Sequence, residues 1–84
     1  MYELIYSGRA LKELKKLARE DKDRIIASLE RIRIRPEAHL LKMVGSPLYR
    51  LKVGQYRAII KIENDNLLII VIKIGHRKNV YDKL

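Results

Sequence analysis

The spacing of apolar residues changes once along the chain, from a helical period to the alternation of strands. The run YELIY at 2–6 predicts a first strand. Ser7 then suits a helix N-cap, because its hydroxyl can accept a bond from a free backbone N–H group. The residues that follow recur at helical spacing and predict a first helix: Ala10, Leu11, Leu14, Leu17 and Ala18.

A second helix is predicted directly after the first. Asp21 and Asp23 suit its start, where negative charge meets the positive end of the helix dipole. Pro36 marks its end. Its apolar stripe consists of Ile25, Ile26, Leu29 and Ile32. The connection ARED at 18–21 is short, so we expect the two helices to pack as an antiparallel hairpin.

Three strands are predicted after Pro36. They are LYRLKV at 48–53, QYRAIIKIE at 55–63 and LLIIVIKI at 67–74. Gly54 permits a tight turn between the first two, and NDN at 64–66 suits a hairpin turn. The last run is apolar on both faces, which is typical of a central strand. We therefore predict one α+β domain over residues 1–84, ordered β-α-α-β-β-β, with a twisted, mostly antiparallel sheet and a two-helix hairpin on one face.

The charge of the chain narrows the choice of partner. Nineteen Lys and Arg against ten Asp and Glu give a net charge of +9, which favours nucleic acid, an acidic protein or an anionic membrane surface. The absence of Cys excludes disulfides and thiolate zinc sites. The first ten residues lack the pattern of a signal peptide, and LLIIVI at 67–72 is too short to span a bilayer. We expect a soluble, cytoplasmic protein.

The strand pattern assigns the cations to one face of the sheet. Side chains alternate along a strand, so Arg50 and Lys52 should point away from the helices while Tyr49, Leu51 and Val53 point toward them. The same reasoning predicts that Arg57 and Lys61 point away from the helices and that Tyr49 and Tyr56 are core residues. We expect Arg50, Lys52 and Arg57 to converge on one patch.

The chemistry open to such a patch is restricted. Between Ala38 and Ile62 there are five bases and no acid. No metal-ligand spacing or glycine-rich loop is present, so we expect neither a metal nor an organic cofactor. Metal-free attack of a ribose 2′-OH on the adjacent phosphorus remains, with cations stabilising the developing charge. The residues alone indicate a nucleic-acid-binding sheet, and they leave open a ribonuclease or an ordinary solvated surface. His76 suits either acid–base chemistry or a structural hydrogen bond, and His39 is assigned no role.

Two motifs add a family resemblance. YRLKVGQYR at 49–57 and IGHRKNVY at 74–81 closely resemble the RelE-type toxins of the RelE/ParE superfamily, and the earlier segments agree. The resemblance implies a toxin that is encoded beside an antitoxin. It also implies ribosome-dependent cleavage of mRNA in the A site by 2′-OH attack, which leaves a cyclic phosphate and inhibits translation.

The resemblance further implies roles for single residues. Arg50 and Lys52 would activate the 2′-OH or hold the backbone, Arg57 would stabilise the phosphate, and Arg77 would act at the leaving 5′-oxygen. Tyr81 would stack on or orient the nucleotide. An Arg at position 50 is a poor general base, so His76 could take over acid–base work. Further RNA-binding cations are expected at Lys42, Lys61 and Lys78.

The same resemblance leaves rival functions open. ParE-type relatives share the fold but are associated with poisoning DNA gyrase. A third possible function is that of a non-catalytic RNA- or ribosome-binding module. The expected protein partner is a RelB-like antitoxin that contributes an amphipathic helix and acidic residues, in a toxin–antitoxin hetero-oligomer. The other expected partners are the ribosome and mRNA, with no membrane.

Overall fold

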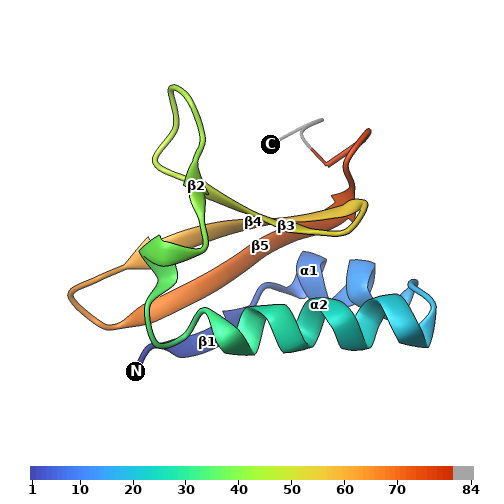
Figure 1. The fold of residues 1–84 in the computed structure, drawn as a ribbon, viewed down its shortest axis with the longest axis horizontal. Coiled ribbons are helices and arrows are strands. Elements are labelled where there is room, and N and C mark those ends of the chain that lie inside the picture. The colour runs from blue at the N-terminus through green and yellow to red at the C-terminus, as the bar shows by residue number, and fades with distance from the viewer. Residues whose placement is uncertain (81–84) are drawn as a thin grey trace.

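The protein is a mixed five-stranded sheet with two helices on one face (Figure 1), as seen in a computed structural model that describes residues 1–80. The strand order is β1-β5-β4-β3-β2, with β1 parallel to β5 and all other neighbours antiparallel. This confirms the predicted α+β fold. The elements are β1 (Glu3–Tyr6), α1 (Gly8–Lys15), α2 (Arg19–Arg31), a 3₁₀ turn (Pro36–Ala38), β2 (Leu41–Lys42), β3 (Tyr49–Val53), β4 (Tyr56–Glu63) and β5 (Leu68–His76).

The helices begin where their caps and charges favour it. The Ser7 hydroxyl accepts a hydrogen bond from the backbone N–H of Ala10 at 3.0 Å, which confirms Ser7 as the N-cap of α1. Helix α2 begins at Arg19, two residues before the predicted start, so Glu20 and Asp21 lie in its first turn beside the positive end of its dipole. It ends at Arg31, before Pro36. Within residues 1–80, neither helix is long and apolar enough to cross a membrane.

Strand β2 was not predicted from the sequence, and β5 is longer than predicted. Strand β2 contains only two residues, which is too short for alternation to be visible in the sequence. It pairs with β3 through Leu41 and Lys42 and extends the sheet at that edge. Strand β5 continues to His76 and lies between β1 and β4, so its predicted central position is confirmed.

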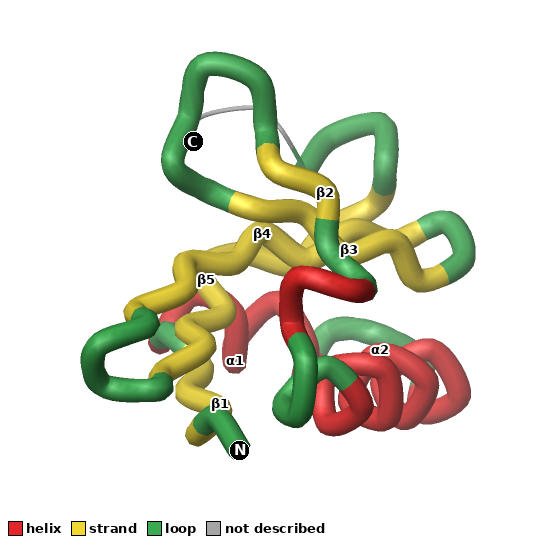
Figure 2. The backbone as a smooth tube through the Cα atoms, turned by 60° about the vertical axis from the view of Figure 1, so that its left-hand side comes forward, coloured by secondary structure: helices red, strands yellow, loops and turns green. Residues whose placement is uncertain are grey.

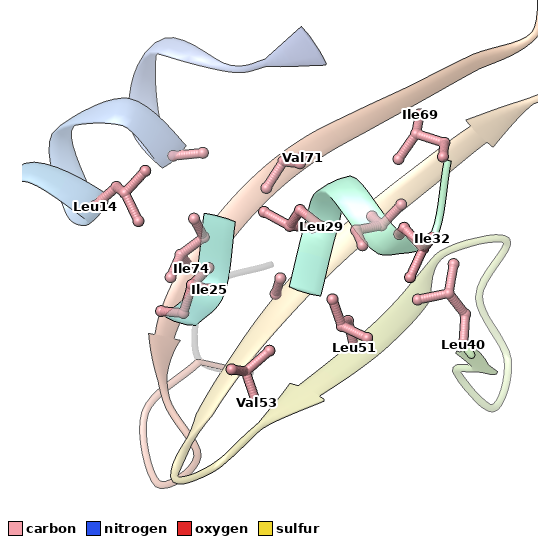
Figure 3. Close-up of a cluster of buried hydrophobic side chains, with 13 residues drawn as sticks. Leu14, Ile25, Leu29, Ile32, Leu40, Leu51, Val53, Ile69, Val71 and Ile74 are labelled. Carbon is pink, nitrogen blue, oxygen red and sulfur yellow. The ribbon is translucent and has the colours of Figure 1, made fainter. Parts of the chain in front are cut away.

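A single apolar cluster joins the helices to the sheet (Figure 3). Leu14 of α1 and Leu29 of α2 face Leu51 and Val71 across it, and all four are buried. The rings of Tyr49 and Tyr56 pack against this cluster, as predicted. Burial of this apolar area is the main stabilising contribution to the fold. The opposite side of the sheet has no helix over it in the part of the chain that the structure describes (Figure 2).

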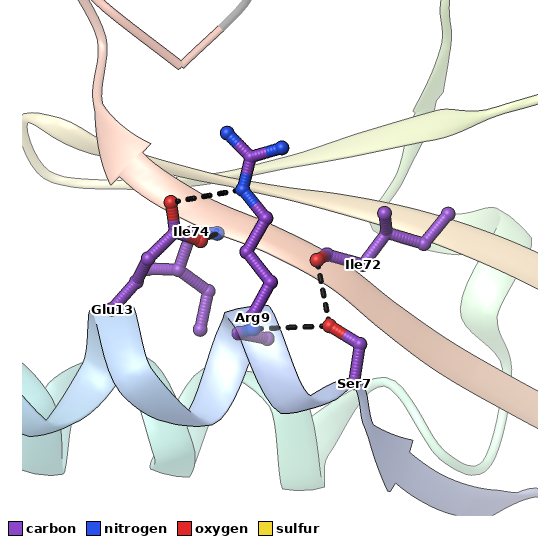
Figure 4. A network of polar contacts seen from close by, with 6 residues as sticks. Ser7, Arg9, Glu13, Ile72 and Ile74 are labelled. Atoms are coloured by element: carbon purple, nitrogen blue, oxygen red, sulfur yellow. Dashed lines mark hydrogen bonds and ion pairs between the residues drawn. The ribbon is translucent and has the colours of Figure 1, made fainter. Parts of the chain in front are cut away.

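A β-bulge in β5 decides which of its later residues face each side. Ile59 pairs with Lys73 but Ile60 pairs with Val71, so Ile72 is the extra residue. Helix α1 contacts the bulge from below (Figure 4): the Ser7 hydroxyl donates to the Ile72 carbonyl at 2.7 Å. The Ile74 N–H donates to the Glu13 carboxylate at 2.8 Å. After the bulge, Ile74 points into the core, whereas Lys73 lies on the open face beside Ile59.

Candidate functional site

The open face of the sheet carries a small hollow lined by three cations. Its volume is about 270 Å³, and its lining residues are His39, Leu41, Arg50, Lys52 and Arg57. The strand register produces this grouping, because Leu41 pairs with Arg50 and Lys52 pairs with Arg57. Paired residues project to the same side of a sheet. Arg50, Lys52 and Arg57 therefore lie together, as the alternation predicted.

The guanidinium of Arg57 is held in place by the turn between β3 and β4. Its Nη1 donates to the carbonyl oxygens of Gly54 at 3.0 Å and of Tyr56 at 2.9 Å. The structure gives it no other polar partner among residues 1–80, so its remaining N–H donors can meet a phosphate. Arg57 is half-buried, whereas Arg50 and Lys52 are exposed. The site thus combines one positioned guanidinium with two solvent-facing cations.

Among residues 1–80, those that line the hollow include three cations and no carboxylate. Like charges that share a small volume repel each other, and an anion placed between them relieves that repulsion. A phosphodiester carries the required charge, and an Arg guanidinium matches the geometry of two phosphate oxygens. Within residues 1–80, no three His, Asp or Glu residues lie close enough to hold a metal ion. Binding a phosphodiester is the chemistry that this arrangement suits.

Two residues of this region had no assigned role in the sequence analysis. His39 lines the hollow because the 3₁₀ turn at Pro36–Ala38 directs the chain to the start of β2. Lys73 is the one charged residue that is nearly fully buried within residues 1–80, at 5% exposure. The register aligns it with Ile59 and Arg50 across three strands. A single Lys inside an otherwise apolar strand was the signal that could have identified it.

Two of the predicted RNA-binding cations lie apart from the hollow. Lys42 pairs with Tyr49, whose ring packs on the helix-facing core, so Lys42 projects to the side opposite Arg50. Lys61 projects to the open face but makes an ion pair with Glu63 at 3.5 Å and does not line the hollow. The structure does not bring these two residues together with the three cations.

The turn after β5 carries Arg77 and Lys78, both exposed. In Figures 1 and 2 this segment and the connection between β2 and β3 rise from the sheet on the side away from the helices. Arg77 is anchored through its backbone N–H, which donates to the Gln55 carbonyl at 2.8 Å. The predicted site residue Tyr81 lies outside the described residues.

His76 lies on the other side of the sheet from the cations. It pairs with Tyr56, and the two rings meet edge to face with centroids 6.0 Å apart. The Tyr56 hydroxyl donates to the Asp21 carboxylate on α2 at 3.3 Å, which fixes this side as the helix-facing one. Partial desolvation, and then the Asp21 carboxylate, raise the pKa of Tyr56 above its ordinary value, so the phenol stays protonated at neutral pH. His76 is thus separated by the sheet from the hollow.

Solved structures of toxin–antitoxin complexes share this architecture. A chain of the intact E. coli RelBE toxin–antitoxin complex is 28% identical and has a TM-score of 0.79, with 90% of this chain and 96% of that chain covered. The RelB–RelE complex from Methanococcus jannaschii matches at 26% identity and a TM-score of 0.73, over 93% and 95% of the two chains. The archaeal RelE–RelB complex from Pyrococcus horikoshii, at 22% identity and a TM-score of 0.79 over 94% and 98%, supports the fold alone.

The family follows from a match that spans nearly the whole chain. A search of curated protein sequences found no match. Residues 4–81 match the family model described as the ParE toxin of the type II toxin–antitoxin system parDE. Together with the structural matches to RelE proteins, this shows that the chain belongs to the ParE toxin family of type II toxin–antitoxin systems, within the RelE/ParE superfamily.

Proposed function

We propose that this toxin is a metal-independent endoribonuclease that cleaves mRNA in the ribosomal A site. The observation that carries the proposal is the hollow on the open face, where Arg50, Lys52 and Arg57 lie together. The similarity to RelE structures at 26–28% identity supports the same choice.

The reaction needs charge stabilisation more than any other contribution. The ribose 2′-oxygen attacks the adjacent phosphorus while the bond from phosphorus to the 5′-oxygen breaks. The 2′-OH loses a proton and the leaving 5′-oxygen gains one, which gives a 2′,3′-cyclic phosphate and a 5′-OH. Arg57 stabilises the negative charge that develops on the phosphoryl oxygens, because its guanidinium is already fixed by two carbonyl bonds.

The other cations surround the same phosphodiester. Arg50 and Lys52 hold the backbone beside the 2′-OH, and Arg77 acts at the leaving oxygen from the turn after β5. Tyr81 stacks on the nucleotide. Lys78, exposed in the same turn as Arg77, adds a contact to the RNA backbone.

The proposed protein partner is a RelB-like antitoxin in a hetero-oligomer. Three of the matched structures are toxin–antitoxin complexes, from E. coli, Pyrococcus horikoshii and Methanococcus jannaschii. The charge of +9 favours a partner whose acidic residues neutralise the open face, and an amphipathic helix would supply apolar contacts. Binding is expected to be tight and to weaken with added salt.

A second function is favoured by one observation, the family model itself, whose description names the ParE toxin of parDE. A gyrase-directed toxin of this fold would leave mRNA intact and trap cleaved DNA. A third function, a non-catalytic RNA- or ribosome-binding module, would use the same cationic face without turnover.

Primer extension on one mRNA tests the choice. The protein is added to translating ribosomes and, separately, to the naked RNA, with the variants Arg57→Ala and Arg77→Ala and the matched control Lys61→Ala. Loss of one positioned charge stabiliser is expected to lower the rate on the order of 10²–10³-fold. Lys61→Ala is expected to cleave as the unmutated protein does, because Lys61 is paired with Glu63 outside the hollow.

Cuts confined to ribosomes, at in-frame positions, support the proposed reaction. Equal activity in all three variants would contradict the assignment of the site. Intact mRNA together with trapped DNA cleavage complexes would establish gyrase as the target instead. Ribosome or RNA binding without any cut would identify the non-catalytic module.

A further inference from the structure

The turn that carries Arg77 is attached to the rest of the molecule through the side chain of His76. Its Nε2 lies 3.1 Å from Oε1 of Gln55, in the turn between β3 and β4. Its Nδ1 accepts a hydrogen bond from the backbone N–H of Lys78 at 3.3 Å. The ring therefore links Lys78, on the far side of Arg77, to Gln55 in the neighbouring turn.

The backbone of the same segment is bonded at three further points. The N–H groups of Asn79 and Val80 both donate to the His76 carbonyl at 2.9 Å. The Arg77 N–H donates to the Gln55 carbonyl at 2.8 Å. Val80 is fully buried and packs against Gly75. Arg77 thus has a fixed backbone under an exposed side chain, and Gln55 contributes both a side-chain and a backbone contact.

The contacts of His76 define its chemical form. An imidazole nitrogen that accepts a bond from an amide N–H carries no proton, so in the neutral ring the proton is on Nε2. Nε2 then donates to the Gln55 amide oxygen. Both nitrogens are occupied inside the protein, and the ring lies on the helix-facing side with Tyr56. This arrangement leaves no ring nitrogen directed at a ribose or a leaving oxygen in the hollow.

We infer that His76, together with Gln55, is a positioning residue that fixes the turn bearing Arg77 relative to Arg57. The β3–β4 turn contacts both residues: the Gln55 side chain bonds His76, and the carbonyl of the adjacent Gly54 accepts a hydrogen bond from Arg57. The two guanidinium-bearing segments therefore share one support. Displacement of a reacting group by about 1 Å costs on the order of 10²-fold in rate, so a loose turn would lower activity without loss of charge. The inference rests on the proposed function.

Substitutions that imitate one ring nitrogen at a time separate positioning from acid–base catalysis. His76→Asn places an acceptor near the position of Nδ1 and keeps the bond to the Lys78 N–H, as in an Asx turn. His76→Gln places an amide donor near the position of Nε2 and keeps the contact with Gln55. His76→Ala keeps neither, and none of the three side chains titrates. Gln55→Ala removes the same contact from the other side.

Cleavage on translating ribosomes is expected to fall on the order of 10-fold or more in His76→Ala and to recover in His76→Gln, which keeps the contact with Gln55, to within about threefold of the unmutated rate. His76→Asn keeps only the bond to Lys78 and is expected to lose about as much activity as Gln55→Ala. Gln55→Ala is expected to lose activity as well, and the double variant His76→Ala/Gln55→Ala to lose little more than His76→Ala alone, since His76→Ala already removes the contact with Gln55. Equal loss in all three His76 variants, with Gln55→Ala fully active, would overturn the inference in favour of acid–base catalysis. Full activity in His76→Ala would also overturn it.

Two further measurements keep this test separate from the proposed function. Growth arrest on expression ranks the same variants whatever the target of the toxin, with Arg77→Ala as the inactive reference. Amide hydrogen exchange at Lys78 reports the connection itself: protection is expected in the unmutated protein and in His76→Asn, and its loss in His76→Ala. If mRNA stays intact but growth arrest ranks the variants as expected, the proposed ribonuclease activity is wrong and the positioning role of His76 is supported. Rapid exchange at Lys78 in the unmutated protein would overturn the positioning role alone.

Discussion

The two faces of the sheet have opposite chemistry. The helix-covered face holds a cluster of 13 buried residues, all of them apolar. The open face holds Arg50, Lys52 and Arg57 around a hollow, and within residues 1–80 its buried positions are few: Ile59, Lys73 and Val80. Because successive residues of one strand supply both faces, the same short segments serve stability on one side and anion binding on the other. Substitutions at neighbouring positions should therefore have very different effects.

The largest effect is expected on the covered face, from Leu29→Ala. Leu29 is fully buried against the sheet, so truncation removes apolar contacts and leaves a cavity. The free energy of unfolding is expected to fall by about 2–5 kcal/mol. Urea unfolding followed by circular dichroism measures the loss, as a lower midpoint with an unchanged slope.

Lys15→Ala provides the control for that measurement, since Lys15 is an exposed helix residue. Surface changes of this kind usually stay within about 0.5 kcal/mol. A Leu29→Ala protein as stable as this control would contradict the assignment of the covered face as the core.

A smaller effect is expected where α1 contacts the bulge. The Ser7 hydroxyl has two separate functions: it accepts from Ala10 as the helix cap and donates to the Ile72 carbonyl. Ser7→Ala removes both and is expected to cost about 0.5–2 kcal/mol of unfolding free energy. Ser7→Asp can still cap the helix, but an ionised carboxylate has no proton to donate to Ile72.

The comparison of these two variants shows which function of Ser7 dominates. If the bond to Ile72 matters, Ser7→Asp will be no more stable than Ser7→Ala. Recovery of the full stability in Ser7→Asp would show that Ser7 acts only as a cap. Glu13→Gln is the companion variant, because its amide oxygen can still accept from the Ile74 N–H and should preserve the bulge.

The bulge also marks the limit of what the sequence could predict. Alternation correctly placed Arg50, Lys52 and Arg57 on one face, because β3 and β4 are regular there. Unbroken alternation from Ile69 and Val71 would direct Lys73 into the core. The extra residue Ile72 reverses this, and it is held by contacts from α1, more than 50 positions earlier in the chain. A local pattern contains no information about such contacts.

The same limit applies to His39 and His76. The position of His39 beside the hollow depends on the pairing of β2, which is too short to be visible as a pattern. The sequence could show that His76 is adjacent to Arg77, but only the pairing with Tyr56 assigns it to the other face. The role of Tyr81 remains a prediction.

The smallest effect on stability, with a clear effect on binding, is expected on the open face from Lys52→Gln. Lys52 is exposed and lines the hollow, so its loss should change the unfolding free energy by no more than about 0.5 kcal/mol. If Lys52 contacts a phosphate, RNA affinity should fall, and the slope of log K against log salt should decrease by about 1 because one fewer counterion is released. Fluorescence anisotropy with a labelled single-stranded RNA at several salt concentrations measures both quantities.

Lys61→Gln, which removes the same charge from the same face outside the hollow, should leave the slope nearly unchanged. Equal slopes for the two variants would mean that the open face binds RNA as a diffuse positive surface, and that the hollow has no special role in contacting the backbone.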